Sequence, residues 1–121
     1  MNILLVDDDT GILETMDDIL TTLQYNVETA HSGCEALRLI KTNRIHYNFI
    51  LMDMKMPEMD GIETSEKILA IHPKEQIFMI SAYISPEMKS RANKAGIKTL
   101  LNKPIDLDNL QRLLKRKSVI K

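Results

Sequence analysis

Two groups of acidic residues each follow directly on a hydrophobic segment, which points to a site for a cation or a nucleophile. The acids are Asp7, Asp8 and Asp9 after residues 2–6, and Asp53 after residues 47–52. Short apolar segments with polar ends are typical of buried parallel strands, whose carboxyl ends meet at the ligand-binding edge of an open α/β sheet. Carboxylates gathered there repel one another unless a cation lies between them, which favours an oxygen-binding ion such as Mg²⁺. One carboxylate left facing solvent could then act as a nucleophile.

Two further strand ends deliver side chains to the same edge of the expected sheet. Ser81 follows the apolar segment 76–80, and Lys103 follows the segment 98–101. Carboxylates, a hydroxyl and a lysine that converge in this way suit phosphoryl transfer to a carboxylate. The lysine and a metal would offset the charge on the phosphoryl oxygens, and the hydroxyl could donate to one of them. The histidines are scattered away from this edge, so neither a ligand nor a phosphodonor is expected among them; they are His31, His46 and His72.

Hydrophobic strands alternate with amphipathic helices along the whole chain. The expected strands are residues 2–6, 26–30, 47–53, 76–80 and 98–101. The expected helices carry apolar faces from Ile12 to Leu23, from Ser32-Gly33 to about Asn43, from Ile62 to Ile71, from the Ser85 N-cap to Gly96, and from Asp106 onward. Asp9 is expected to be an N-cap or first-turn acid of the first helix. This alternation predicts βαβ units with right-handed crossovers and a parallel sheet.

Length and composition limit the classes of protein that the chain could represent. Its 121 residues predict one domain, 1–121, and 44% hydrophobic residues suffice for a core. A net charge of −1 gives no reason to expect nucleic-acid binding. No apolar segment is long enough to span a membrane and the early acids rule out a signal peptide, so we expect a cytoplasmic protein. The single Cys34 rules out an internal disulfide and is expected to be a small, partly buried residue near a helix start.

Four motifs, each at a strand end, together resemble the receiver domain of two-component response regulators. They are Val6-Asp7-Asp8, the run from Leu51 to Gly61, Ser81-Ala82 and Lys103-Pro104. The resemblance covers essentially the whole chain. It implies the CheY-like, doubly wound (βα)5 fold of the flavodoxin-like group, with a five-stranded parallel sheet of order 2-1-3-4-5.

The resemblance assigns a role to each matching acid. Asp53 would be the phosphoacceptor, and Mg²⁺ would bind to Asp8 directly and to Asp7 largely through water. Asp53 and the backbone carbonyl of Lys55 would complete the protein ligands. Lys103 would pair with the phosphate, and the peptide bond that follows it, before Pro104, would be cis.

Other matching positions would modulate the switch. Ser81 occupies the position of the switch hydroxyl, where Thr is commoner. Leu100 stands where many receivers carry an aromatic residue that changes rotamer, so coupling through this position is not expected. Lys55 and Tyr83 make the chain similar to the sporulation phosphorelay receiver. Because a long amine and a ring could hinder an attacking water, they predict slow self-dephosphorylation.

The resemblance implies a phosphorylation-dependent switch rather than an enzyme acting on other substrates. A sensor histidine kinase or a histidine phosphotransfer protein would supply the phosphoryl group, and self-phosphorylation and self-dephosphorylation are the only reactions expected. The face formed by the fourth helix, fifth strand and fifth helix would change shape. The protein is expected to be a monomer or a weak dimer that binds neither nucleic acid nor membrane.

Two other functions remain open at this point. A degenerate receiver would act as an interaction module without phosphorylation, although such receivers usually lack the acids or the lysine. An aspartyl-phosphate phosphohydrolase of the haloacid dehalogenase-like group would use an Asp-x-Asp motif, which Asp7-Asp8-Asp9 superficially matches. Gly11 stands where that group needs Thr or Val, and the chain lacks both room for a cap domain and a late acidic pair.

Overall fold

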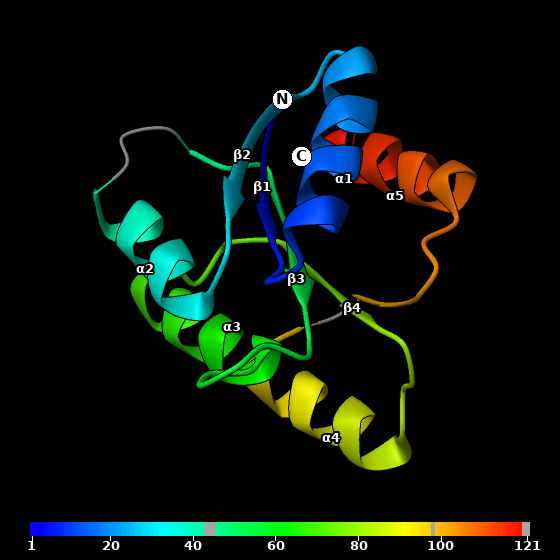
Figure 1. Ribbon diagram of the computed structural model, residues 1–121. Coiled ribbons are helices and arrows are strands. Elements are labelled where there is room, and N and C mark those ends of the chain that lie inside the picture. Colours follow the sequence, from blue (N-terminus) through cyan, green and yellow to red (C-terminus); the bar gives the residue numbers. More distant parts are fainter. Residues whose placement is uncertain (43–45, 98, 120–121) are drawn as a thin grey trace.

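The structure, a computed structural model, describes residues 1–42, 46–97 and 99–119 and forms a sheet between two layers of helices (Figure 1). The strands are β1 (Asn2–Val6), β2 (Asn26–Ala30), β3 (Phe49–Asp53), β4 (Ile77–Ser81) and β5 (Thr99–Asn102). The helices are α1 (Thr10–Thr22), α2 (Gly33–Thr42), α3 (Gly61–Ile71), α4 (Pro86–Ala95) and α5 (Leu107–Val119). All strand pairs are parallel, in the order β2-β1-β3-β4-β5. The predicted doubly wound, flavodoxin-like fold is therefore confirmed.

Each face of the sheet buries its own apolar core, and this explains why the central strands are hydrophobic throughout. Helices α1 and α5 cover one face, and α2, α3 and α4 cover the other (Figure 1). The rings of Phe49 and Phe78 lie on the α1–α5 side with centroids 5.5 Å apart. On the other side, Ile50 and Met79 pack beneath α2, α3 and α4 and are completely buried. Every residue of β3 and β4 is buried, so these two strands are firmly placed.

Local hydrogen bonds set the ends of the helices that border the acidic edge. The side chains of Asp9, Asp60 and Ser85 are N-caps of α1, α3 and α4. Each accepts a hydrogen bond from the backbone N–H three residues further on, at 3.2, 2.8 and 3.1 Å respectively. Helix α4 ends at Gly96, whose φ of 97° closes the helix in the left-handed region. Ala92 is the only fully buried residue of α4, with Met88 and Ala95 partly buried against the same core, so the end caps add to a small packing interface.

Strand ends deviate from the predicted ranges by one or two residues. β3 begins at Phe49 rather than residue 47, because the Asn48 side chain accepts a hydrogen bond from the Asn2 N–H at 2.7 Å and holds the chain at the sheet margin. β4 and β5 each extend one residue beyond the predicted end, to Ser81 and Asn102. The predicted helix end at Asn43 and strand start at Lys98 lie outside the described residues.

Some apolar residues are more exposed than their spacing predicts. Ile12 and Leu23 lie at the two ends of the α1 segment and are 37% and 39% exposed. Cys34 is exposed rather than partly buried, because its neighbour Gly33 faces Thr64 and Met59 and turns Cys34 outward. Helical spacing predicts which side of a helix is apolar, but it does not predict how far along the helix neighbouring elements cover that side.

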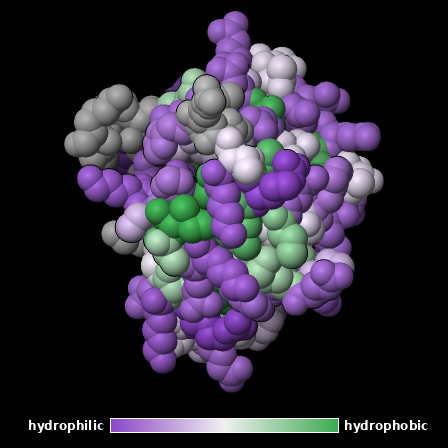
Figure 2. Space-filling view, turned by 90° about the vertical axis from the view of Figure 1, so that its left-hand side faces the viewer, coloured by the Kyte–Doolittle hydropathy of each residue, from purple (hydrophilic) through white to green (hydrophobic). Residues whose placement is uncertain are grey.

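The outer surface on the α2 and β2 side is mainly polar. Figure 2 shows this side largely covered by hydrophilic residues, with a small hydrophobic area near its centre. Among the described helices, none combines the length and the apolar character needed to cross a membrane.

Candidate functional site

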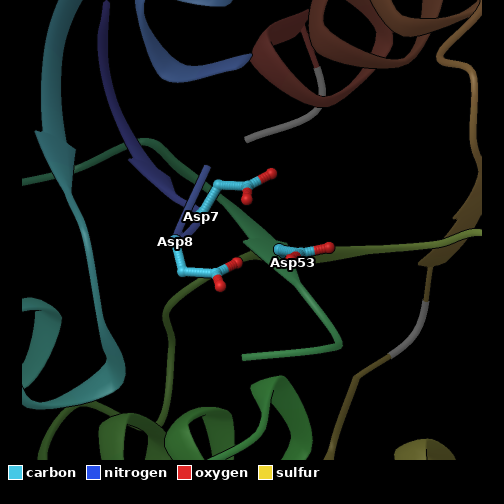
Figure 3. A group of neighbouring side chains, drawn as sticks. All are labelled: Asp7, Asp8 and Asp53. Carbon is cyan, nitrogen blue, oxygen red and sulfur yellow. The ribbon is translucent and has the colours of Figure 1, made fainter. Parts of the chain in front are cut away.

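Three carboxylates, here called the acidic cluster, meet where β1 and β3 end. Asp7 and Asp8 follow β1, and Asp53 is the last residue of the neighbouring β3 (Figure 3). One ligand atom from each lies within 4.8 Å of the others. Asp53 is 3% exposed and Asp7 8%, whereas Asp8 is exposed. Two of the three carboxylates are thus withdrawn from water, which strengthens their mutual repulsion.

Lys103 supplies the positive charge next to this cluster. Its Nζ lies 2.8 Å from Asp53 Oδ1 and 3.9 Å from Asp7 Oδ2. The Lys103 N–H donates to the carbonyl of Ser81 at 2.9 Å, and the Lys103–Pro104 peptide is cis, as the resemblance implied. Burial alone would lower the pKa of Lys103, but the hydrogen bond and charge of Asp53, followed by Asp7, raise it above its ordinary value. The ammonium is therefore held in its charged form.

The environment of Asp7 shows that the acidic cluster fits a cation. Burial raises the pKa of Asp7 from 3.8 to about 6, and the charge of Asp53 adds to this effect. A hydrogen bond at 2.9 Å from the Asp9 N–H to Asp7 Oδ1 acts in the opposite direction. An oxygen-only set of two buried carboxylates and one exposed carboxylate is the kind of ligand set that Mg²⁺ prefers. A bound cation would offset the buried negative charge whose unfavourable energy raises the pKa of Asp7.

Ser81 lies at this edge but does not bond to Asp53. Its hydroxyl donates to the carbonyl of Tyr83 at 2.9 Å and is mostly buried. Tyr83 and Lys55 are exposed at the mouth of the site, with Tyr83 73% exposed. Leu100 is half-buried against the core beneath α2, α3 and α4, away from the cleft.

These residues surround an open cleft of about 620 Å³. Its lining includes all the predicted site residues except Leu100: Asp7, Asp8, Asp53, Lys55, Ser81, Tyr83 and Lys103. Three residues that also line the cleft were not predicted from the sequence to belong to the site: Ile12, Asp60 and Met88. Asp60 caps α3, and its Oδ2 lies 3.3 Å from Arg91 of α4. An Asp-Gly pair before an apolar stripe could have indicated the cap, but not the partner on α4.

A tight backbone approach fixes the chain just beyond Asp53. The Gly61 N–H donates to the carbonyl of Met54 at 2.8 Å. A Cβ at position 61 would collide with the carbonyl oxygen of Asp53 and crowd the Cα of Met54. Glycine is therefore needed where the loop returns to begin α3, and this contact holds the end of β3, with Asp53, in place.

Comparison with known proteins identifies this arrangement. The family model described as the response regulator receiver domain matches residues 3–115. The chain belongs to this family. Among solved structures, the receiver is similar to a CheY-like receiver domain protein from Methanospirillum hungatei JF-1, with a TM-score of 0.86, 31% identity and coverage of 99% and 98% of the two chains. The chemotaxis protein CheY4 of Vibrio cholerae gives a TM-score of 0.86 and 31% identity, covering 95% of this receiver and 96% of that chain.

Curated relatives are much longer than this receiver. The transcriptional regulatory protein ZraR of Escherichia coli O157:H7 is 38% identical over 116 residues, which is 96% of this chain and 26% of ZraR. The receiver therefore spans about a quarter of the length of that relative. Family membership favours a receiver over the phosphohydrolase alternative.

Proposed function

We propose that this receiver accepts a phosphoryl group on Asp53 from the phosphohistidine of a cytoplasmic sensor histidine kinase or histidine phosphotransfer protein. The observation that carries the proposal is Asp53 itself, a buried strand-end carboxylate held at 2.8 Å by Lys103 beside two further acids. Nothing else at the described sheet edge offers a nucleophile so placed. The domain spans residues 1–121 in this proposal, acts as a switch and binds neither nucleic acid nor membrane.

The chemistry follows from the charges around Asp53. One carboxylate oxygen, Oδ1, is held by Lys103, so the other oxygen can attack phosphorus. The new O–P bond forms as the P–N bond of the donor breaks, and the departing imidazole keeps the electron pair. Lys103 stays close enough to pair with a phosphoryl oxygen. Asp7, Asp8, Asp53 and the Lys55 carbonyl would hold Mg²⁺, which when bound offsets the negative charge of the phosphoryl oxygens.

Ser81 can convert this chemical change into movement. Its hydroxyl now donates to the Tyr83 carbonyl, and in the phosphorylated state it would donate to a phosphoryl oxygen instead. Releasing that carbonyl frees the segment that leads into α4. Because α4 buries only Ala92, a small gain in free energy is enough to shift its population between two positions. The face made by α4, β5 and α5 would then present a new surface to the output partner.

Lys55 and Tyr83 are proposed to control how long the phosphoryl group remains. Both line the cleft and are exposed, so they can shield the acyl phosphate from water. We expect a phosphoprotein lifetime of many minutes, followed through loss of labelled phosphate, and shorter lifetimes for Lys55→Ala and Tyr83→Ala. Leu100→Ala, which alters a position away from the cleft, is the matched control and should leave the lifetime unchanged. A wild-type lifetime of seconds would sink this proposal.

Intact-mass measurement after incubation with acetyl phosphate tests the central proposal. With Mg²⁺ present, one phosphoryl group of about 80 Da should be added. The addition should be absent with EDTA and absent in Asp53→Asn, which keeps the shape of the side chain. If the protein binds Mg²⁺ but gains no mass, from either acetyl phosphate or a phosphorylated histidine phosphotransfer protein, the receiver is degenerate and acts as an interaction module.

The oligomeric state of the receiver and its route to an effector form a separate proposal. ZraR is named as a transcriptional regulatory protein, and the part that matches this receiver is 26% of its length. We propose that the receiver itself is a monomer or weak dimer and passes its state to an effector through the α4–β5–α5 face. Sedimentation with and without phosphorylation measures the oligomeric state directly.

A further inference from the structure

Glu75 is a buried acid that the proposed phosphoryl transfer does not use. It lies in the loop between α3 and β4, where its side chain is only 4% exposed. Its Oε2 has no hydrogen-bond partner within the described part of the chain. Burial raises the pKa of the Glu75 carboxyl above its ordinary value. A buried carboxylate oxygen without a partner is costly, so a ligand or a proton is needed to satisfy it.

His46 brings an imidazole nitrogen to this acid from a different loop. It lies just before β3, its side chain is 73% exposed, and Nδ1 is 3.7 Å from Glu75 Oε1. This separation is too long for a good hydrogen bond. It is close to the roughly 3.3 Å expected between two atoms that each lie about 2.0–2.1 Å from one tetrahedral Zn²⁺. The two atoms are at ion-pair distance, and a small side-chain adjustment would bring both within reach of one ion.

His72 offers a second imidazole beside the same carboxylate. It is the C-cap of α3, and its carbonyl accepts a hydrogen bond from the Glu75 N–H at 3.2 Å, so a short turn joins the two residues. When protonated, the imidazoles of His46 and then His72 lower the pKa of Glu75 and offset part of the effect of its burial. The side chain of His72 is exposed and can change rotamer without displacing the core.

We infer that His46, His72 and Glu75, here called the distal site, bind a divalent transition-metal ion of the Zn²⁺ class. Two imidazoles and a carboxylate suit such ions better than Mg²⁺, and water would complete a four-coordinate shell. Among the described residues, only the acidic cluster has three ligand atoms within 4.8 Å of one another. The ligand atoms of the distal site are therefore farther apart, and the His72 side chain has to rotate toward Glu75 as the ion binds. Because His46 precedes β3 and Asp53 ends it, the two sites lie at opposite ends of the sheet.

Calorimetric titration with Zn²⁺ alone tests the distal site, using the full chain with saturating Mg²⁺. One Zn²⁺ per chain should bind, and His46→Ala, His72→Ala and Glu75→Gln should each weaken binding at least tenfold. His31→Ala removes the remaining histidine, which precedes α2, and should bind Zn²⁺ like the wild type. The two exposed histidine variants keep the test valid even if Glu75→Gln alters the fold.

A second variant separates the distal site from the acidic cluster. Asp8→Asn removes an exposed carboxylate of the acidic cluster and should leave the high-affinity Zn²⁺ site intact. Substituting Co²⁺ gives an independent readout, because a visible absorption band from tetrahedral Co²⁺ should appear in the wild type and in Asp8→Asn but not in His46→Ala. Zn²⁺ binding that survives His46→Ala and His72→Ala, or that is lost only in Asp8→Asn, overturns the inference. So does the absence of binding, which would leave a proton as the partner of Glu75.

Discussion

Replacing Asp7 by Asn should stabilise the receiver when no divalent cation is present. Asp7 is 8% exposed and faces Asp53 and Asp8, and its pKa is raised to about 6. A carboxylate whose pKa is higher in the folded chain binds its proton more tightly there. The fold therefore loses stability as the pH rises from the ordinary pKa of 3.8 to the raised pKa of about 6, and the loss is complete above that pH. Asn cannot ionise and avoids this loss, while its Oδ1 can still accept from the Asp9 N–H.

The expected magnitude follows from the two pKa values. The difference between about 6 and 3.8, at about 1.4 kcal/mol per pKa unit, gives about 3 kcal/mol at pH 7.5. At pH 4.5 the same relation leaves about 1 kcal/mol, because the wild-type carboxylate is then protonated in the folded chain. The Asn variant should thus gain about 2–3 kcal/mol at pH 7.5 and much less at pH 4.5.

Urea unfolding in EDTA, followed by circular dichroism at both pH values, measures the effect. Asp8→Asn is the matched control: it removes an equal charge from the acidic cluster but at an exposed position, so a change of less than about 1 kcal/mol is expected. Saturating Mg²⁺ should abolish or reverse the advantage of the Asp7 variant, because binding stabilises the wild type by mass action. If Asp7→Asn is no more stable than the wild type at pH 7.5, or gains as much at pH 4.5, the reasoning from burial is refuted.

Four further substitutions test other contacts by urea unfolding. Lys103→Met should destabilise the EDTA-treated protein by roughly 2–4 kcal/mol, since Asp53 would remain buried without its positive partner; an unchanged midpoint would contradict this. Ser65→Ala should stabilise by about 1 kcal/mol, because Ser65 Oγ is buried and has no hydrogen-bond partner among the described residues. Thr64→Ala should destabilise by about 1–2 kcal/mol through loss of its hydrogen bond to the Asp60 carbonyl. If both variants change the free energy of unfolding in the same direction, the explanation through hydrogen bonds is wrong. Gly61→Ala should cost about 1–3 kcal/mol and slow phosphorylation in the mass assay, because the new Cβ would displace the Asp53 carbonyl; wild-type stability and rate would show that the loop can move aside.

The sequence predicts those site residues whose position follows from strand polarity. Asp7, Asp53 and Ser81 come together because parallel strands end at the same edge, and no side-chain detail is needed to see it. The hydroxyl partner of Ser81 could not be foreseen, since it depends on a rotamer and on the carbonyl of Tyr83. The sequence also did not predict that Ile12 lines the cleft, because its position in the apolar stripe of α1 is typical of a core residue.

Burial of charged loop residues is the other feature that the sequence does not disclose. Glu75 stands between Lys74 and Gln76 in a polar segment, and such a segment normally indicates a solvated turn. It is buried because the loop between α3 and β4 folds back against the start of β3, where His46 meets it. That contact joins residues far apart in the chain, and hydrophobic periodicity contains no information about it.

The sparse anchoring of α4 has a consequence for how receivers of this kind can diverge. The helix is specified mainly by Ser85 at one end and Gly96 at the other, with Ala92 as its single buried side chain. Substitutions at its exposed positions leave the core intact, so selection can alter them almost independently of folding. Duplicated genes could therefore acquire different signalling partners by changing this helix, while the residues that handle the phosphoryl group stay under strict constraint.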